Sequence, residues 1–436
     1  HLSDQYGLNA SDTEYKYIMN FLLERFVSIE DTVQIHRYVY YNESEYTLYL
    51  QCSRDYVYKI TGSSVTKITN GTDDVIFDPT FAPEEYAYIE DHDTGFSSWR
   101  DLFINMINFT EDEDVPLNPA QSRYLLERYI KYIPFAYSMP TKPLISFVGR
   151  KGSGKTMALR IMFSVLFGQN KFNVVGMHSK LEKDWQTLSS QNIFLVIDNC
   201  DDKRHNSWFP DALAAAATGQ KMQAREYYTT NDLTEYKVNL LIGLTARTPA
   251  FKREDVNERL LLFKVDPINR SERIAESKIL KRIFNQRDEL MTELIHSIQT
   301  SLKRLEMNKD LEPKQNIRIA DFSDFVFKTI PEDHRGRFGE IVDTINESQA
   351  AFTLEDNPLW INIREVLDDM PLPEEITTVR LYGRIMSNQG ENSKFNRYYS
   401  KHNFAKNFKK ILDEINMHSN YTIEWLGRGT GNKTYL

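Results

Sequence analysis

The chain has 436 residues and a formal net charge of −9, and by its length it accommodates about three domains. Its aromatic and aliphatic content is that of a globular protein with hydrophobic cores. No run of about 18 apolar residues occurs, and the N-terminus has no signal-peptide pattern, so we expect no membrane span and no leader. Cys52 and Cys200 stand in unrelated contexts. This excludes a disulfide framework or a zinc site and favours a cytoplasmic location. Residue 1 is histidine rather than methionine, which leaves open whether a further domain lies upstream.

Charge is distributed unevenly along the chain. Residues 1–120 hold 22 Asp and Glu against 7 Lys and Arg, a balance of −15. Residues 377–436 hold 10 Lys and Arg against 4 Asp and Glu, a balance of +6. An acidic surface repels nucleic acid and a basic surface attracts it, so we expect nucleic acid to contact the tail. A merely solvated surface explains the acidic front equally well.

Residues 1–115 are expected to form an acidic α/β accessory domain. Helices are predicted at residues 14–26 and 97–109. Between them, β-forming runs separated by turn residues predict strands at residues 33–41, 46–52, 56–60, 65–69 and 75–77. The region contains no catalytic constellation, so its expected role is to bind a partner. An acidic run at residues 111–114 is the predicted linker to the next domain.

Residues 149–156 match the phosphate-binding pattern G-x-x-x-x-G-K-[ST] at every defined position. They are Gly149, Arg150, Lys151, Gly152, Ser153, Gly154, Lys155 and Thr156. A β-type run precedes them and a helix-type run follows, which is the context that a phosphate cradle needs. Lys155 would reach the β- and γ-phosphates, and the Thr156 hydroxyl would hold Mg²⁺. The motif predicts a site for a nucleoside triphosphate.

A second apolar strand, predicted at residues 193–198, ends in the carboxylate of Asp198. Beside the P-loop, this carboxylate would complete the Mg²⁺ shell. Asn199 occupies the place where many such ATPases have a glutamate that polarises the attacking water. An amide can orient water but cannot act as a base. The identity of the catalytic base is therefore open, with Asp201 and Asp202 as alternatives.

A third apolar run, at residues 238–244, leads to Thr245, a polar residue at a strand tip that can position water beside the γ-phosphate. Further on, Arg253 and Arg259 precede a final predicted strand. An arginine there could reach the γ-phosphate held by a neighbouring subunit and stabilise transition-state charge. Arg259 is the preferred candidate for this role. The alternative is that either arginine is a surface charge or an intrachain ion-pair partner.

These motifs, in this order, resemble the core of an AAA+ ATPase, which would occupy residues 116–270. More narrowly, the chain is similar to replicative helicases of phages and mobile elements, relatives of superfamily 3 and minichromosome-maintenance helicases. The similarity is carried by residues 217–219, 225–229, 241–244 and 255–259, by an Arg-x-Ala-Asp-Phe pattern at 318–322 and by residues 70–77 in the front.

The resemblance implies a hexameric ring that binds ATP between subunits and moves along single-stranded DNA. It also implies a hairpin of residues 221–228 and 233–237 that enters the ring's channel. There, Lys221 and Arg225 would contact phosphates, and Tyr227 or Tyr228 would stack on a base. An ordinary hairpin that packs its tyrosines into the subunit is the alternative.

Residues 271–355 would then be a helical lid and connector. In this segment Arg318 is a second sensor, another trans-acting arginine or a salt-bridge partner.

Residues 356–436 predict a winged helix. Helices are expected at residues 359–370, 378–386 and 400–417, followed by short strands at 421–425 and 433–436. Lys406, Lys409 and Lys410 on the last helix would contact double-stranded DNA, and Arg428 would lie at the wing tip. A winged helix that does not bind DNA is the alternative.

Together these features predict a ring-forming, ATP-dependent DNA helicase that acts in replication of a phage or mobile element, with a replication protein bound at its front domain. The alternative is an ATP-switched initiator or helicase loader that binds DNA without unwinding it. A regulatory AAA+ module acting on a protein partner is disfavoured, because the Gly-Ala-Phe-Thr-Gly-Ala loop of such activators is absent.

Overall fold

The structure is a computed structural model. It describes residues 11–27, 34–90, 98–111, 116–171, 174–176, 181–200, 208–219, 221–225, 233–248, 253–313, 317–355, 357–371, 376–389, 399, 403–419, 421–424, 428–429 and 433–434. Within these ranges, none of the helices has the length and apolar character needed to cross a bilayer.

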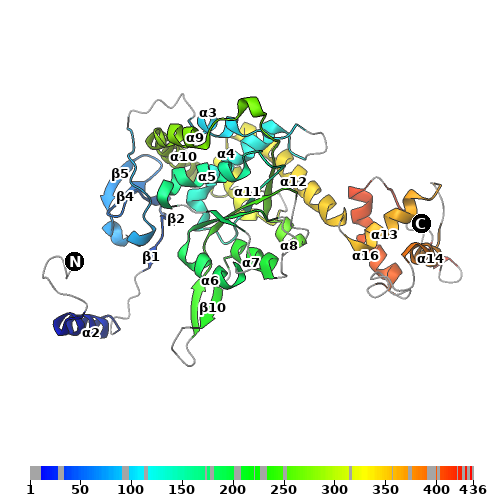
Figure 1. The fold of residues 1–436 in the computed structure, drawn as a ribbon, viewed down its shortest axis with the longest axis horizontal. Coiled ribbons are helices and arrows are strands. Elements are labelled where there is room, and N and C mark those ends of the chain that lie inside the picture. The colour runs from blue at the N-terminus through cyan, green and yellow to red at the C-terminus, as the bar shows by residue number, and fades with distance from the viewer. Residues whose placement is uncertain are drawn as a thin grey trace.

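Five parallel strands form the centre of the molecule (Figure 1). Their order across the sheet is β13 (Leu260–Lys264), β7 (Leu144–Val148), β12 (Leu241–Ala246), β9 (Phe194–Asp198) and β8 (Val174–Gly176). The central strands are continuous apolar runs, as expected for parallel strands that are buried on both faces. Because β12 lies between β7 and β9, the carboxyl ends of these three strands are neighbours. Ligands of open α/β sheets bind at this edge.

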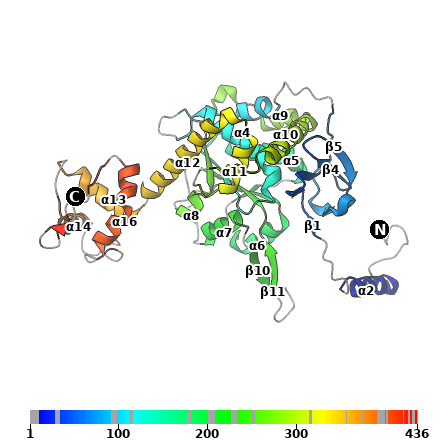
Figure 2. The same ribbon diagram turned by 180° about the vertical axis from the view of Figure 1, so that it is seen from behind.

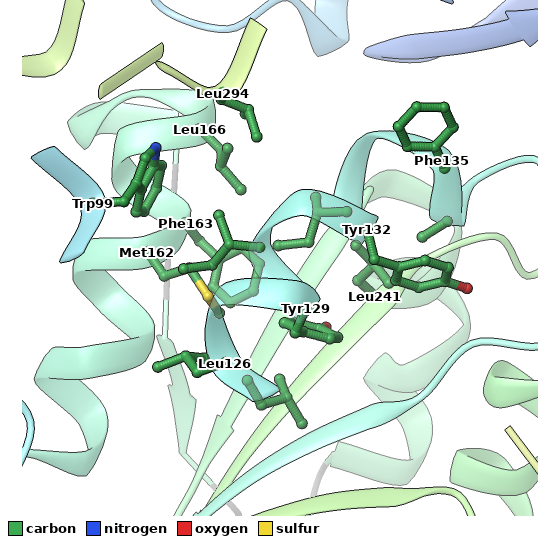
Figure 3. Close-up of a cluster of buried hydrophobic side chains, with 14 of the residues drawn as sticks. Trp99, Leu126, Tyr129, Tyr132, Phe135, Met162, Phe163, Leu166, Leu241 and Leu294 are labelled. Carbon is green, nitrogen blue, oxygen red and sulfur yellow. The ribbon is translucent and has the colours of Figure 1, made fainter. Parts of the chain in front are cut away.

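Alternate residues of each strand enter two different cores. In β7, Ile145 and Phe147 pack toward α4 (Pro119–Ala136) and α5 (Lys155–Phe167). Figure 3 shows this core, where aromatic rings of α4 lie beside apolar side chains of α5. The intervening β7 residues pack on the other face with α6 (Leu181–Gln191) and α7 (Trp208–Ala217). The prediction of a parallel sheet flanked by helices is therefore confirmed.

The layer around α4 continues with three further helices. They are α9 (Glu276–Phe284), α10 (Arg287–Met307) and α11 (Ala320–Thr329). The rings of Tyr132 on α4 and Phe322 on α11 meet edge to face with centroids 5.1 Å apart. The helical character of residues 271–310 was expected, and this contact shows that α11 packs directly on the motor core.

The front region folds as a small antiparallel sheet. Its strands are β2 (Val39–Asn42), β3 (Thr47–Gln51), β4 (Tyr56–Ile60) and β5 (Val65–Thr69), in that order. One face packs on the motor, where the rings of Tyr41 and Phe135 meet edge to face with centroids 5.2 Å apart. The other face carries a separate small cluster of buried residues.

Two predictions for the front region are wrong. The single strand expected at residues 33–41 is split into β1 (Ile35–His36) and β2, because Tyr38 has a φ of 64° and interrupts the extended chain. The helix expected at residues 97–109 is only α3 (Ser98–Leu102), followed by the 3₁₀ turn η3 (Ile104–Met106). Phe103, at φ −129° and ψ −62°, ends α3. The first predicted helix is present as α2 (Thr13–Val27).

The C-terminal region has a hydrophobic core of its own. Its helices are α13 (Pro358–Asp368), α14 (Thr378–Gln389) and α16 (Phe404–His418). The long helix α12 (Arg335–Glu355) extends from the motor to these helices (Figure 2).

The strand predicted at residues 421–425 is wrong. The Asn416 side chain holds the backbone of Ile423 through hydrogen bonds of 2.9 and 2.7 Å, so this segment follows α16 instead of pairing. The strands are β14 (Arg428–Gly429) and β15 (Lys433–Thr434). A winged helix remains a prediction for this region.

Candidate nucleotide-binding site

The P-loop links the carboxyl end of β7 to the first turn of α5. Gly152 and Gly154 have φ angles of 86° and 79°, a left-handed conformation in which a side chain would be strained. The Lys155 ammonium donates hydrogen bonds to the carbonyl oxygens of Gly149 (2.7 Å) and Arg150 (3.2 Å). The N-terminus of α5 therefore opens toward a loop that already carries a positive charge. Free backbone N–H groups, the helix dipole and an ammonium together favour a phosphate.

The ends of β9 and β12 and the first turn of α5 meet at the carboxylate of Asp198. The Thr156 hydroxyl donates to Asp198 Oδ1 at 2.7 Å, and the Thr245 hydroxyl donates to the same oxygen. The Asn199 amide donates to Asp198 Oδ2 at 3.0 Å, and the Asn199 backbone N–H donates to Thr245 Oγ1 at 3.2 Å. The structure thus brings together four of the predicted site residues. Asp201 and Asp202, the alternatives for a catalytic base, lie outside the described residues.

The donor set fits Mg²⁺ bound together with a phosphate. Thr156 and Asp198 offer neighbouring hydroxyl and carboxylate oxygens, the hard ligands that Mg²⁺ prefers. In the described ranges, no cluster of three or more His, Cys, Asp or Glu side chains could hold a metal ion. Mg²⁺ usually keeps several waters and is held by one or two protein ligands plus substrate phosphates. A two-residue site therefore fits a Mg²⁺–nucleotide complex better than a resident metal.

A cavity of about 590 Å³ opens above the P-loop. Its walls include Asp198, Asn199 and Arg247 together with most of the loop. Arg247 was not singled out from the sequence. It follows β12 by one residue and is exposed. The reasoning that selected Thr245, a polar residue at a strand end, also applies to Arg247 and could have identified it.

A second unpredicted arginine lies over the P-loop. A Cβ atom added to Gly152 would lie 2.8 Å from Nη2 of Arg273. The Arg273 Nε–H donates to the carbonyl of Ile268 at 3.2 Å, and the Ile268 N–H donates to the carbonyl of Gly152 at 3.1 Å. The chain after β13 therefore crosses the P-loop and places a cation beside it. No sequence pattern marks Arg273, because its position depends on this crossing.

An apolar hollow of about 60 Å³ adjoins the same loop. Met106 and Ile107 enter it from the front region, and Ile268 and Ile279 from the segment after β13. An apolar wall beside a phosphate cradle suits one face of a nucleobase. The front region therefore helps to build the site, although its sequence contains no recognisable site residues.

The two predicted finger arginines lie away from their own P-loop. The Leu144 N–H donates to the Arg259 carbonyl at 2.8 Å, which places Arg259 at the amino edge of the sheet. The P-loop leaves the opposite edge, about 15 Å away along a five-residue strand. The Arg259 guanidinium donates to the Asp255 carbonyl. Arg253 forms ion pairs of 2.6 Å with Asp211 and with Asp255.

Arg318, the arginine singled out in the lid, forms an ion pair of 2.9 Å with Glu258. A salt-bridge partner is one of the roles that the sequence left open for this residue.

The residues predicted to contact DNA lie in two separate regions, the β10–β11 hairpin and the tail. Strands β10 (Lys221–Arg225) and β11 (Leu233–Lys237) pair antiparallel, with Lys221 opposite Lys237. Their hairpin projects from the body in both views (Figures 1 and 2). The strand predicted to reach residue 228 is described as far as Arg225, and Tyr227 and Tyr228 lie outside the described residues.

The tail residues show one difference from prediction. Lys406, Lys409 and Lys410 are exposed on α16. Arg428 was expected in a turn at the wing tip, but it belongs to β14 and is in register with Thr434. A strand at residues 428–429 therefore replaces the middle of the turn predicted at residues 426–431, and the contact of Arg428 with DNA stays a prediction.

No protein-family model and no curated protein sequence matches the chain. Among solved structures, the A-form apo structure of the NrS-1 C-terminal region is similar over 87% of this chain and 93% of that chain, at 11% identity and a TM-score of 0.39. A structure of JCV helicase with a bound phenylacetamide compound is similar over 57% of this chain and 67% of that chain, at 12% identity and a TM-score of 0.24. Structural similarity at this level does not indicate the function of this chain.

Proposed function

We propose that this chain is an ATP-dependent DNA helicase of the AAA+ type that assembles into a ring. One observation carries the proposal: the hydroxyls of Thr156 and Thr245 converge on Asp198 beside the loop that holds Lys155. These groups match the parts that phosphoryl transfer requires, which are a phosphate cradle, a metal ligand set and a polar group beside the γ-phosphate.

Each group of the site has a distinct task in hydrolysis. One face of the base would pack on the apolar hollow, and the P-loop N–H groups would bind the phosphate oxygens. Lys155 exchanges its contacts with the Gly149 and Arg150 carbonyls for phosphate oxygens. Mg²⁺, held by Thr156 and Asp198, would neutralise phosphate charge. Thr245 and Asn199 orient the attacking water, since an amide and a hydroxyl can hold it by hydrogen bonds.

The position of Arg259 supports a ring. It lies at the amino edge of the sheet, so it cannot stabilise charge at its own P-loop. In a head-to-tail ring it would face the carboxyl edge of the next subunit, which is how a heterologous interface closes. The transition state at each ATP would then be completed in trans by Arg259, or by Arg253 once its contacts to Asp211 and Asp255 open.

Two features support DNA as the track. The β10–β11 hairpin projects from the motor and carries Lys221 and Arg225. Helix α16 exposes three lysines in a region with a balance of +6. The hairpin would hold single-stranded DNA in the channel, and the tail, as a winged helix, would hold the duplex. We place this activity in the cytoplasm, in replication of a phage or mobile element.

Asn199 favours the second candidate, an ATP-switched initiator or helicase loader. An amide at this position cannot accept the proton of the attacking water, so hydrolysis would be slow and ATP would act mainly as a switch. Such a protein would bind ATP and DNA and would assemble, but it would not separate strands.

The proposal is tested by ATP hydrolysis with and without single-stranded DNA. The comparison uses the unmodified chain, Lys155→Ala and, as a matched control, Lys183→Ala, which removes an exposed lysine of α6 outside the P-loop. We expect DNA to stimulate hydrolysis in the unmodified chain and the control, and Lys155→Ala to lose at least 100-fold. DNA-independent hydrolysis, or equal rates for Lys155→Ala, would contradict the proposal.

A further inference from the structure

The outer face of the front sheet holds a cavity of about 600 Å³ whose lining shares no residue with the P-loop cavity. Rings of His36, Tyr40 and Tyr49 line it in a stack, with centroids 4.0 Å and 6.0 Å apart. Carboxylates of Asp74 and Glu45 also line it, and both residues are exposed. This face points away from the motor, because the opposite face of the sheet is the one packed on α4.

The loop that bounds this cavity is strained and firmly fixed. Asp73 and Asp74 both have a φ of 59°, so two successive residues with side chains adopt the left-handed conformation. The Asn70 side chain closes the loop by two hydrogen bonds to the backbone of Phe77, of 2.9 and 2.8 Å. Asp73 is held by Lys59 at 2.6 Å and by the Tyr49 hydroxyl at 3.0 Å. Strain maintained in this way is typical of ligand clamps.

The charge of the cavity excludes anionic ligands. Three carboxylates line it against one ammonium, that of Lys59, which is already paired with Asp73. A phosphate backbone would be repelled by the cavity and by the surrounding region, whose balance is −15. A guanidinium or ammonium group would instead find carboxylates beside aromatic rings, the combination that binds organic cations.

Two exposed isoleucines belong to the strand pair that contributes His36 to the cavity. Ile35 on β1 pairs in register with Ile76 on β6 (Ile76–Phe77), and the two residues are 62% and 37% exposed. They adjoin the lining residues His36 and Val75 in the chain. Exposed aliphatic side chains next to a charged pocket are typical of a protein-binding surface rather than a small-molecule site.

We propose that this cavity binds a basic side chain of a protein partner, with aliphatic neighbours of that side chain packed on Ile35 and Ile76. The rigid loop presents Asp74 to the cation, the turn between β2 and β3 presents Glu45, and the ring of Tyr40 contacts its alkyl stem. The acidic front region then provides a docking site for a protein with a short basic and aliphatic segment. This site is independent of ATP and of the proposed helicase activity.

The probe is a fluorescein-labelled hexapeptide of alternating leucine and arginine, measured by fluorescence polarisation with the full chain. The pocket variants are Asp74→Asn with Glu45→Gln, and separately Tyr40→Ala. The control is Asp55→Asn, which removes one exposed carboxylate of the same region outside the cavity. Asparagine tolerates the left-handed conformation, so Asp74→Asn keeps the loop intact. Thermal melting checks that each variant is folded.

We expect the double pocket variant to raise the Kd at least tenfold, Tyr40→Ala to raise it at least threefold, and the control to stay within twofold. An equal loss in the control would show non-specific attraction to an acidic surface and overturn the proposal. It would also be overturned by no peptide binding to the unmodified chain. If a labelled thymidine oligonucleotide binds to the unmodified chain but not to Tyr40→Ala, the cavity belongs to a nucleic-acid surface instead.

Discussion

Asn199 adopts a left-handed backbone conformation, with a φ of 59°, directly after β9. Asparagine tolerates this conformation better than most residues because its short side chain forms local hydrogen bonds, here to Asp198. A glutamate would pay roughly 1–2 kcal/mol to adopt it. The amide at this position therefore follows from the turn that places Asn199 between Asp198 and Thr245, and a catalytic base has to come from another residue.

Arg273 is the residue whose role is most open to a direct test. Because its guanidinium lies over Gly152, we expect Arg273→Ala to raise the KM for ATP about tenfold or more, the loss of one charge-assisted hydrogen bond of roughly 1.5–3 kcal/mol. The turnover number should change less than the KM. Steady-state ATPase kinetics measure both.

The matched control for this substitution is Arg270→Ala. Arg270 is exposed on the same segment, in η5 (Arg270–Glu272). Equal KM values for Arg273→Ala and the unmodified chain would show that Arg273 does not contact the nucleotide.

A site residue could be predicted when its sequence signal lies within a short local motif. The P-loop and Asp198 are readable from the sequence because each lies within a short motif that fixes its own backbone. Thr245 is readable because it ends an apolar strand. Arg273 and the apolar hollow are not readable, since their positions depend on a chain crossing and on helices more than 100 residues apart in the sequence.

Glu127 of α4 links this helix to α3 through an ion pair with Arg100. Its carboxylate, 10% exposed, accepts from Arg100 at 2.5 Å, Arg128 at 2.7 Å and Lys131 at 2.7 Å. Burial alone would raise the pKa of Glu127, but the positive charges of Lys131 and Arg128 and the hydrogen bonds to it lower this pKa from 4.5 to about 2. Since Arg100 belongs to α3, this network fixes the front helices that wall the nucleotide site.

We predict that Glu127→Gln lowers the free energy of unfolding by about 3 kcal/mol at pH 7, because it leaves buried positive charges without a counter-ion. The folded pKa is lower than the unfolded pKa, so the carboxylate contributes its full stability above about pH 4.5 and loses it as pH falls toward 2. Urea unfolding between pH 7 and 3 measures this difference. A difference that stays constant down to pH 3, or one equal to that of the exposed Glu306→Gln, would contradict the prediction.

The β10–β11 hairpin gives a second prediction at this scale. Lys221→Ala with Arg225→Ala should weaken binding of single-stranded DNA and reduce the salt slope of log K by about 0.7 for each lost phosphate contact. ATP hydrolysis without DNA should be unchanged, because the hairpin lies outside the site. The exposed Lys278→Ala on α9 is the control. Unchanged DNA affinity and slope in the double variant would remove the hairpin from the DNA path.

Helices and strands with a strong hydrophobic periodicity could be predicted from the sequence, whereas elements fixed by tertiary contacts could not. Strands β7, β9, β13 and β11 and helix α9 lie where their patterns indicate, whereas β8 was not identified from the sequence. Three elements depart from the pattern of their sequence. The positive φ of Tyr38 interrupts the first strand, and a change of direction at Phe103 ends α3 early. The side chain of Asn416 holds the segment that was expected to be a strand, so the strand β14 comes later in the chain. Helix α12 was not identified as a single long helix, since Gly336 and Gly339 weaken its helical signal.

For the whole molecule, the opposite locations of the P-loop and Arg259 predict complementation between subunits. Arg259→Ala and Lys155→Ala should each lose ATPase activity by at least 100-fold, because a trans arginine contributes on the order of 10³–10⁵ to phosphoryl transfer. Mixing the two variants should restore part of the activity, since some interfaces then combine an intact P-loop with an intact arginine. No recovery in mixed assemblies of confirmed mass would contradict a shared site.

The central claim, that ATP hydrolysis is coupled to strand separation, is tested most directly by strand displacement on a forked DNA duplex. The assay compares the assembled unmodified chain with Lys155→Ala, in the presence of ATP and Mg²⁺. We predict displacement that requires ATP and is lost in the variant. An assembled chain that binds ATP and the fork but displaces no strand would contradict the helicase and favour the initiator or loader.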